Sequence, residues 1–215
     1  RDLHSFPTRR SSDLAIPEFD ACMETEQSNP HHMYSVGEHI IKSLGYVRND
    51  KVLRLTMLLH DIAKPLTITT DDEGINHFQG HAQLGAKMAH DIFRRLKFDR
   101  NTMDRVCNLI KYHDDRFLAT SKNVRRVMKR VGEDEFSFLL DVKYADTMAQ
   151  SDYFREEKLR NIEESRALYE NVKKEGECVS LKKLAVNGKD LIELGVSPGK
   201  IARSEERRVG KECRS

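Results

Sequence analysis

The sequence predicts an all-α protein, a helical bundle with one small hairpin or irregular loop near residues 67–80. Apolar side chains recur at intervals of three and four residues along most of the chain, which places them on one face of a helix. No β-favouring run is long enough to build a sheet. With 215 residues, of which 38% are hydrophobic and 33% charged, the chain can bury one substantial core.

The two ends of the chain, residues 1–14 and 203–215, differ in composition from the rest. They are rich in Arg, Ser and charge, have no hydrophobic periodicity, and join abruptly to patterned segments. They resemble translated sequencing-adapter sequence, so we interpret them as non-native flanks; disordered native tails are the alternative. Without them the net charge changes from +2 to about −1, and a basic character no longer argues for nucleic acid.

Composition also limits the cellular setting. No apolar run approaches the length of a membrane span, and the N-terminus lacks the apolar stretch of a secretory signal. We therefore expect a cytoplasmic protein without membrane contacts. The four cysteines are scattered without a C-x-x-C pair, which argues against a zinc ribbon or a disulfide framework.

The first predicted helix follows an approach segment, residues 15–33, that carries turn signals. Ser35 with Glu38 three residues later forms a capping box, which marks the start of the helix. His39 shares a helical face with the apolar residues three before it and one after it. Its imidazole is therefore expected to point into the protein.

A second helix, predicted from about Asp50, is apolar along most of its length and reaches His60 and Asp61. A helix this apolar is expected to be buried at the centre of a bundle. Consecutive helical side chains point about 100° apart, so His60 and Asp61 can share one ion only if the helix end turns them together. Pro65 disfavours helix at Lys64 and predicts a bend there.

The middle of the chain changes pattern. Residues 67–80 contain two short β-favouring pieces around an acidic turn, and this acidic cluster lacks the spacing of a calcium loop. Helices are predicted over 81–96 and 102–113, followed by a loop over 114–120. The apolar stripe expected on the first of these helices consists of Leu84, Met88, Ile92 and Leu96.

Helical pattern continues to the C-terminal side. A basic helix is predicted over 123–131, stopped by a glycine, and a further helix over 133–148. A long charged helix is predicted over 154–175, and a short capped helix within 181–202. The thin apolar seam expected on the long helix consists of Leu159, Ile162 and Leu168.

Imidazoles and carboxylates on several of these helices suggest a metal site. Such side chains from different helices of one bundle can close on an ion and leave positions open for water and substrate. Taken singly, each histidine is more often a core or surface residue, Asp146 could be only a turn residue, and Lys64 could simply extend to solvent. The ordered set is harder to explain by independent structural roles, and it consists of His39, His60, Asp61 and Asp146.

Several segments in order resemble the HD superfamily of metal-dependent phosphohydrolases, and more narrowly the C-terminal half of bacterial CCA-adding tRNA nucleotidyltransferases. The resemblance covers roughly residues 15–202 and implies an HD domain over 15–153 with a helical extension over 154–202. The head that carries nucleotide transfer in that family has no counterpart in this sequence, so we expect no addition of CTP or ATP to tRNA. The segments that carry the resemblance include HDIAKP, HFQGHAQLGA, VRRVMKRVG, YADTMAQ and VNGKDLIELGVSPGKIA.

The resemblance implies roles for individual residues. It makes His39, His60, Asp61 and Asp146 the ligands of a divalent ion, Mg, Mn, Ni, Co or Fe. Lys64 matches the lysine that follows the HD pair and is expected to face the substrate phosphate. The histidines common near the site, available for a second ion or for acid–base catalysis, are His81 and His113. The implied activity is hydrolysis of phosphate esters such as 2′,3′-cyclic nucleotides or phosphomonoesters.

A second interpretation has to be kept beside the first. Some relatives use this region mainly to hold the body of tRNA, and the chain would then be a binding module whose nucleotidyltransferase head is encoded upstream. Phosphate contacts would give it salt-sensitive, sequence-independent affinity. The candidate contacts are Arg125, Arg126, Lys129 and Arg130, which otherwise form an ordinary solvated helix face.

Overall fold

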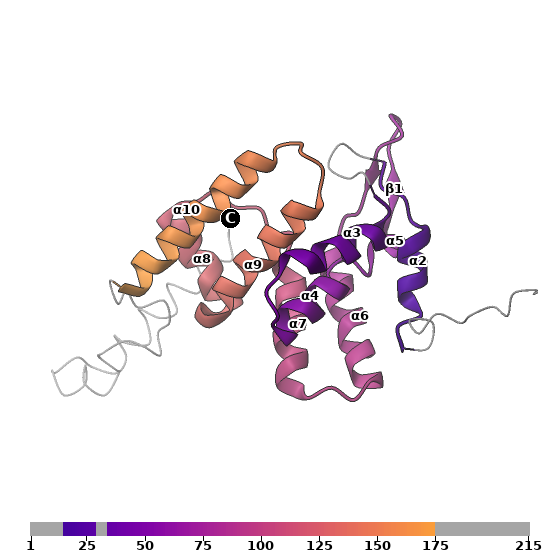
Figure 1. Cartoon of the computed structure of the whole chain (residues 1–215), viewed down its shortest axis with the longest axis horizontal. Coiled ribbons are helices and arrows are strands. Elements are labelled where there is room, and N and C mark those ends of the chain that lie inside the picture. Colours follow the sequence, from indigo (N-terminus) through magenta and orange to yellow (C-terminus); the bar gives the residue numbers. More distant parts are fainter. Residues whose placement is uncertain (1–14, 29–33, 175–215) are drawn as a thin grey trace, which may run out of the picture. The chain divides into compact units, whose positions relative to one another are not determined.

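The computed structural model describes residues 15–28 and 34–174, and it confirms the all-α class (Figure 1). The only strands in this part of the chain are two short ones. The helices are α2 (Glu18–Glu24), α3 (Val36–Ser43), η1 (Leu44–Tyr46, a 3-10 turn), α4 (Lys51–Leu59), α5 (Lys64–Thr67), α6 (His81–Arg95), α7 (Arg100–Tyr112), α8 (Ser121–Val131), α9 (Glu133–Ala149) and α10 (Arg155–Lys174).

Helix α3 begins as its capping box predicts. Ser35 Oγ accepts a hydrogen bond from the Glu38 N–H, and Glu38 Oε2 accepts one from the Ser35 N–H, both at 3.2 Å. Two backbone donors at the helix start are thereby satisfied. With the start of α3 fixed in this way, the His39 side chain faces the interior and is completely buried.

Helix α4 is central, as expected. Asp50 caps it by accepting hydrogen bonds from the backbone N–H groups of Val52 and Leu53, and the helix packs against α3, α7 and α9. Leu53 and Met57 are fully buried in a cluster with apolar residues of α9. This packing fixes where the helix ends, and therefore where His60 is placed.

The HD pair lies in a bend, but Pro65 has a different part in it than predicted. Helix α4 stops at Leu59, and residues 60–63 form turns. Pro65 then lies in the first turn of α5, where its missing N–H removes no helical hydrogen bond. The prediction that Lys64 would not be helical is therefore wrong, because Lys64 begins α5 and Pro65 lies six residues beyond the end of α4.

Residues 67–80 contain the expected hairpin. Strands β1 (Thr69–Thr70) and β2 (Asn76–His77) pair antiparallel, with Thr69 opposite His77. Asp71 Oδ1 accepts hydrogen bonds from the N–H groups of Glu73 and Ile75, at 3.0 and 2.9 Å, which closes the acidic turn. The turn is exposed, in agreement with a solvated loop.

Helix α2 was not predicted, because residues 15–33 were interpreted as an approach segment. It has only seven residues and no side-chain cap, so local signals for it are weak. Tertiary contacts explain its presence: Cys22 is fully buried, and its Sγ donates to the carbonyl oxygen of Ile62 at 3.7 Å. Helix α2 thus covers the turn that carries the HD pair.

The apolar stripes predicted for α6 and α10 coincide with the buried faces only at Ile92 and Ile162. On α6, Leu84 and Met88 are only half-buried and Leu96 is exposed, because the closest packing is made through small residues. A Cβ on Gly85 would lie 3.5 Å from the carbonyl oxygen of His60, so α6 approaches the HD turn closely. The buried residues of α6 are His81, Ala82, Gly85, Ala89, Ile92 and Phe93, and those of α10 are Ile162, Ser165, Tyr169 and Val172.

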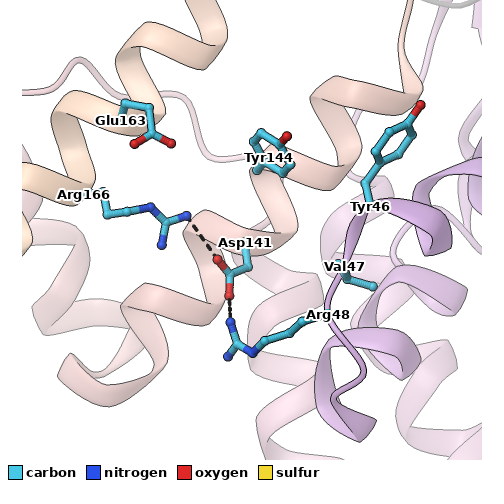
Figure 2. Close-up of a pocket in the computed structure, with 7 residues that line it drawn as sticks. All are labelled: Tyr46, Val47, Arg48, Asp141, Tyr144, Glu163 and Arg166. Carbon is cyan, nitrogen blue, oxygen red and sulfur yellow. Dashed lines mark hydrogen bonds and ion pairs between the residues drawn. The ribbon is translucent and has the colours of Figure 1, made fainter.

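Helix α10 packs against α8 and α9. One attachment is Asp141 of α9, which accepts from Arg166 of α10 at 3.1 Å and also pairs with Arg48 (Figure 2). The cavity beside this pair of arginines has a volume of about 330 Å³. It is lined by Tyr46, Val47, Arg48, Asp141, Tyr144, Glu163 and Arg166.

Some predictions fall on parts of the chain that the structure does not describe. These are the two flanks, 1–14 and 203–215, and the short helix within 181–202. Among the described helices, none combines the length and the apolar character that crossing a bilayer requires.

Candidate metal centre

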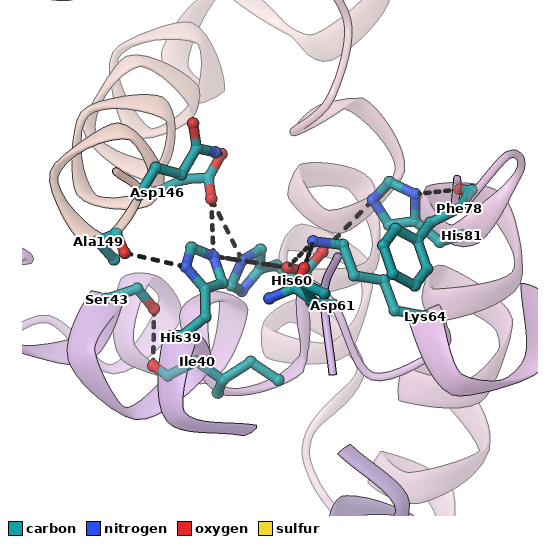
Figure 3. Close-up of polar contacts among 12 residues, drawn as sticks. His39, Ile40, Ser43, His60, Asp61, Lys64, Phe78, His81, Asp146 and Ala149 are labelled. Atoms are coloured by element: carbon teal, nitrogen blue, oxygen red, sulfur yellow. Dashed lines mark hydrogen bonds and ion pairs between the residues drawn. The ribbon is translucent and has the colours of Figure 1, made fainter. Parts of the chain in front are cut away.

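Four predicted ligands from three parts of the fold converge on one point (Figure 3). His39 comes from α3, His60 and Asp61 from the turn after α4, and Asp146 from α9. His39 Nε2 lies 2.9 Å from Asp146 Oδ1, 3.3 Å from His60 Nε2 and 3.5 Å from Asp61 Oδ2. One ligand atom from each residue lies within 4.8 Å of all the others. We refer to this set as the first group.

Asp61 also belongs to a second group, which it forms with His81 and His113. Its Oδ1 lies 3.4 Å from His81 Nε2 and 3.6 Å from His113 Nε2, and these two nitrogens are 3.2 Å apart. The first group contacts the other oxygen, Oδ2. The two oxygens of one buried carboxylate therefore face two clusters of imidazoles.

Backbone carbonyl groups fix the orientation of all four imidazole rings. The Nδ1 atoms of His39, His60, His81 and His113 lie 3.3, 2.8, 2.7 and 2.7 Å from the carbonyl oxygens of Ala149, Met57, Phe78 and Ile110. A carbonyl oxygen only accepts, so each Nδ1 must carry the proton. In the neutral ring this leaves a lone pair on Nε2, directed at the carboxylates.

This arrangement fits a divalent cation. Two neutral imidazoles whose Nε2 lone pairs face each other at 3.3 Å need a cation between them, either a proton or a metal ion. Asp61 Oδ2 is buried and accepts no hydrogen bond from the described residues. Lys64 Nζ lies 2.7 Å from this oxygen, an ion-pair distance that does not meet hydrogen-bond geometry. Imidazole nitrogen and carboxylate oxygen together suit a transition metal.

The two carboxylates are held in the charged form. Burial would raise the pKa of Asp61, but the positive charges of His60 and Lys64 outweigh it and hold this pKa well below its usual value. The loss of water around Asp146 would likewise raise its pKa, and hydrogen bonds from His39 and His60 lower it instead. Both side chains are thus available as anionic ligands near neutral pH.

The histidines divide into two kinds. Burial would lower the pKa of His60, but Asp61 and Asp146 together raise it to about 10, so this ring holds a proton when no metal competes. Burial lowers the pKa of His81, and Asp61 offsets the effect only in part. The first group therefore binds a proton readily, whereas His81 is neutral near pH 7.

Lys64 lies inside the centre rather than at its surface. Its Nζ is 2.7 Å from Asp61 Oδ2 and donates to Gln27 Oε1 at 2.9 Å, and it lies 5.2 Å from the centre of the Phe78 ring. Gln27 is held in turn by the carbonyl oxygen of Tyr34, to which its Nε2 donates at 3.2 Å. Sequence reasoning missed Gln27, since it lies in a segment without periodicity.

Asp146 marks the accessible side of the centre. Its side chain is 22% exposed, whereas those of His39, His60 and Asp61 are at most 2% exposed. Its Oδ2 accepts from Gln150 Nε2 at 2.9 Å. Sequence reasoning also missed Gln150, although its position four residues after Asp146 on a helix is a readable signal.

The predicted RNA contacts lie elsewhere, on α8, and the structure does not bring them to the centre. Arg126, Lys129 and Arg130 are exposed and Arg125 is half-buried. Arg130 is paired with Asp115 at 2.8 Å. The opposite face of the helix is apolar and fully or almost fully buried, formed by Val124, Val127, Met128 and Val131.

Comparisons with known proteins agree with this architecture. The HD domain family matches residues 31–151. The A-adding tRNA nucleotidyltransferase of Deinococcus radiodurans is 33% identical over 124 residues, 55% of this chain and 28% of that protein. The CC-adding tRNA nucleotidyltransferase of Thermus thermophilus is 31% identical over 147 residues, 66% of this chain and 33% of that protein.

A third relative has a different name. The bifunctional uridylyltransferase/uridylyl-removing enzyme of Ruegeria pomeroyi is 26% identical over 132 residues, 49% of this chain and 13% of that protein. The chain thus spans a third or less of the length of these curated relatives. The matches confirm the resemblance inferred from the sequence.

Proposed function

Because the chain belongs to the HD domain family, we propose that it is a metal-dependent phosphohydrolase. In this proposal a divalent ion is held by His39, His60, Asp61 and Asp146. The observation that supports it most directly is the orientation of the rings, since backbone carbonyls direct the Nε2 lone pairs of His39 and His60 at two ionised carboxylates. Each Nε2 atom is thereby available as a ligand atom beside an anionic oxygen.

We further infer that Asp61, His81 and His113 can hold a second ion. The same ring orientation supports this role, because His81 and His113 also donate Nδ1–H to carbonyl groups. Acid–base catalysis by these two histidines is the alternative, and the neutral state of His81 near pH 7 permits either role. Imidazole ligands favour Mn, Fe, Co or Ni over Mg in both groups.

The bound ion and the residues of the chain would have different roles in hydrolysis. The ion supplies Lewis acidity, which polarises a phosphoryl oxygen and acidifies water. Lys64 adds positive charge beside Asp61 and offsets negative charge on the substrate phosphate. The exposed edge at Asp146 provides the approach for a phosphate ester, with 2′,3′-cyclic nucleotides and phosphomonoesters as the proposed substrates.

Hydrolysis with defined metals tests the proposal. The protein, stripped by chelation and reloaded with Mn, Co, Ni or Mg, should open a 2′,3′-cyclic nucleotide or cleave an aryl phosphate, and His60→Ala should not. His90→Ala is the matched control, because this histidine lies on α6 with its side chain 45% exposed and belongs to neither group. Activity that survives chelation, or that persists in His60→Ala at full metal occupancy, would reject the proposal.

A tRNA-binding body is the second candidate function. It is favoured by the names of the two tRNA nucleotidyltransferase relatives and by α8, which is basic on one face and buried on the other. Replacing Arg126 and Lys129 by Ala should then weaken tRNA binding and reduce its dependence on salt, by a slope of about 0.9 per lost phosphate contact on duplex. Unchanged tRNA affinity in this double variant would exclude α8 as the contact surface.

A further inference from the structure

The segment that follows His113 is held by side chains from two helices. Lys143 of α9 donates from Nζ to the carbonyl oxygens of His113 and Asp115, both at 2.7 Å. Asn161 of α10 donates from Nδ2 to the carbonyl oxygen of Phe117 at 3.0 Å, and its Oδ1 accepts from the Ala119 N–H at 2.8 Å. Every second residue from 113 to 119 is therefore anchored.

This anchoring directs the intervening side chains to solvent. Asp114, Arg116 and Leu118 are exposed, Leu118 by 73%, while the anchored residues between them are buried or half-buried. Arg116 forms no ion pair with any residue that the structure describes. An exposed arginine on an anchored stretch of backbone thus lies three residues after His113, a member of the second group.

Lys158 of α10 connects this segment to the accessible carboxylate of the centre. It lies three residues before Asn161, and its Nζ donates to Gln150 Oε1 at 2.7 Å. Gln150 Nε2 in turn contacts Asp146 Oδ2 at 2.9 Å. Lys158 is therefore placed on the side of the centre where Asp146 is exposed.

The electrostatic surroundings of Lys158 include charges of both signs. Burial lowers its pKa most; Asp146 and, more weakly, Asp114 oppose this, while Arg116 and Arg155 lower the pKa further. Asn161, which anchors the backbone at Phe117 and Ala119, lies about one helical turn after Lys158, so the segment that carries Arg116 packs beside this part of α10. A bound anion would offset the repulsion between Arg116 and Lys158.

Two exposed aromatic rings lie at the start of the same helix. Tyr153 and Phe154 are 47% and 55% exposed, with ring centres 4.4 Å apart. Phe154 has a φ of 55°, a backbone conformation that is unfavourable for an aromatic residue. Phe154 is one helical turn before Lys158, and its carbonyl accepts from the Lys158 N–H at 3.1 Å. Exposed rings beside cations are the usual components of a single-strand binding surface.

We propose that Arg116 and Lys158 form a subsite for a second phosphate group, next to the phosphate that is hydrolysed. The inference rests on the proposed function and narrows its substrate to a single-stranded oligonucleotide that ends in a phosphate ester. The terminal phosphate would lie at the metal centre, the preceding phosphate at Arg116 and Lys158, and a base on Tyr153 and Phe154. A mononucleotide would leave the second subsite empty.

Kinetics with two substrates test the subsite. Arg116→Ala should raise KM about 10-fold for a dinucleotide that ends in a 2′,3′-cyclic phosphate, with little change in kcat, since one charged hydrogen bond is lost. KM for the 2′,3′-cyclic mononucleotide should not change. Arg116→Lys should restore much of the affinity. Arg100→Ala is the matched control, because this exposed arginine lies at the opposite end of α7 from His113.

Binding without turnover separates the subsite from the proposed function. In chelator, the anisotropy of a labelled trinucleotide should show weaker binding to Arg116→Ala, and the slope of log affinity against log salt should fall by about 0.7. Binding that depends on Arg116 in a protein that hydrolyses neither substrate would reject the hydrolase and keep the subsite. Hydrolysis of both substrates with unchanged KM in Arg116→Ala, or an equal rise for both, would overturn the subsite.

Discussion

The two carboxylates of the metal centre occupy opposite environments. Asp61 is 1% exposed and lies between the imidazoles of both groups, whereas the Asp146 side chain is 22% exposed and contacts only the first group. Each oxygen of Asp61 faces a different pair of histidines. Asp61 therefore connects the two groups, and Asp146 lies at the accessible edge of the centre.

Each carboxylate is supported by one lysine and one glutamine, in opposite order. Lys64 contacts Asp61 directly and Gln27 stands behind it. On the other side Gln150 contacts Asp146 and the lysine, Lys158, stands behind. A fully buried carboxylate needs a compensating charge close by, while water can stabilise the partly exposed one. The difference in burial explains which partner is nearest.

The largest expected effect comes from exchanging the two carboxylates for amides in turn. Asp61→Asn should abolish tight binding of metal to both groups, while Asp146→Asn should weaken the first group and leave the second. The reason is that only Asp61 has an oxygen in each group. Metal content by elemental analysis, with circular dichroism to confirm the helical fold, measures this. Stoichiometric metal retained in Asp61→Asn would show that it is not a ligand.

The next effect concerns the charge beside Asp61. Lys64→Met should slow hydrolysis by about 10- to 1000-fold at saturating metal, because a positioned charge is lost. Its effect on metal affinity should be smaller. Arg100→Met serves as the control for loss of one positive charge at a highly exposed site. A Lys64→Met enzyme with full turnover would place the phosphate elsewhere.

The same substitution should change how stability depends on pH. The pKa of Asp61 is lowered in the folded protein, so its contribution is present above the unfolded pKa and is lost as pH falls through the folded value. Lys64 is one cause of the low pKa, so the loss should begin at higher pH in Lys64→Met. Melting temperatures of the metal-free proteins across the acidic range test this. Parallel curves would contradict it.

Local signals were sufficient for most of the fold. The capping box at Ser35 and the glycine that stops α8 are contained within a few residues, so both helix ends were predictable. The face buried by α6 was not, because Gly85 and Ala89 pack through small size and carry little hydrophobic signal. Helix α2 depends on a distant contact between Cys22 and the HD turn.

The centre was predictable to a similar degree. His39 was placed inward by its helical face, but the bend lies at residues 60–63 and not at Lys64, where Pro65 predicted it. The division into two groups was not predictable in detail, since only the fold brings His81 near Asp61. Gln27 lies far in sequence from the lysine it contacts, and no spacing rule connects them.

A smaller effect concerns the proton at the first group. His60 has a pKa raised to about 10, so its stabilising interaction with the carboxylates is complete below its unfolded pKa and is lost as pH rises through about 10. An ion bound there must displace this proton. Near pH 8, loading the first group should release about one proton per ion, measured in weakly buffered solution. His60→Ala should release none, and metal uptake by wild type without proton release would contradict the assignment.

The smallest effect on metal binding is expected at Gln150, the glutamine that contacts Asp146. Gln150→Leu removes the donor to Asp146 Oδ2 and should weaken metal binding by the first group about 10-fold, the usual result of losing a partner that orients a ligand. The second group should keep its affinity, because Gln150 does not contact Asp61. Competition with a fluorescent chelator gives the metal dissociation constants of both groups.

Gln150→Glu is the companion variant. If orientation alone mattered, it would act like Gln150→Leu, whereas an added carboxylate beside the ion should partly restore metal affinity. If Gln150→Leu lowered the metal affinity of both groups equally, Asp146 and Asp61 would not act independently. The distinction between Asp61 as the shared ligand and Asp146 as the accessible ligand would then be wrong.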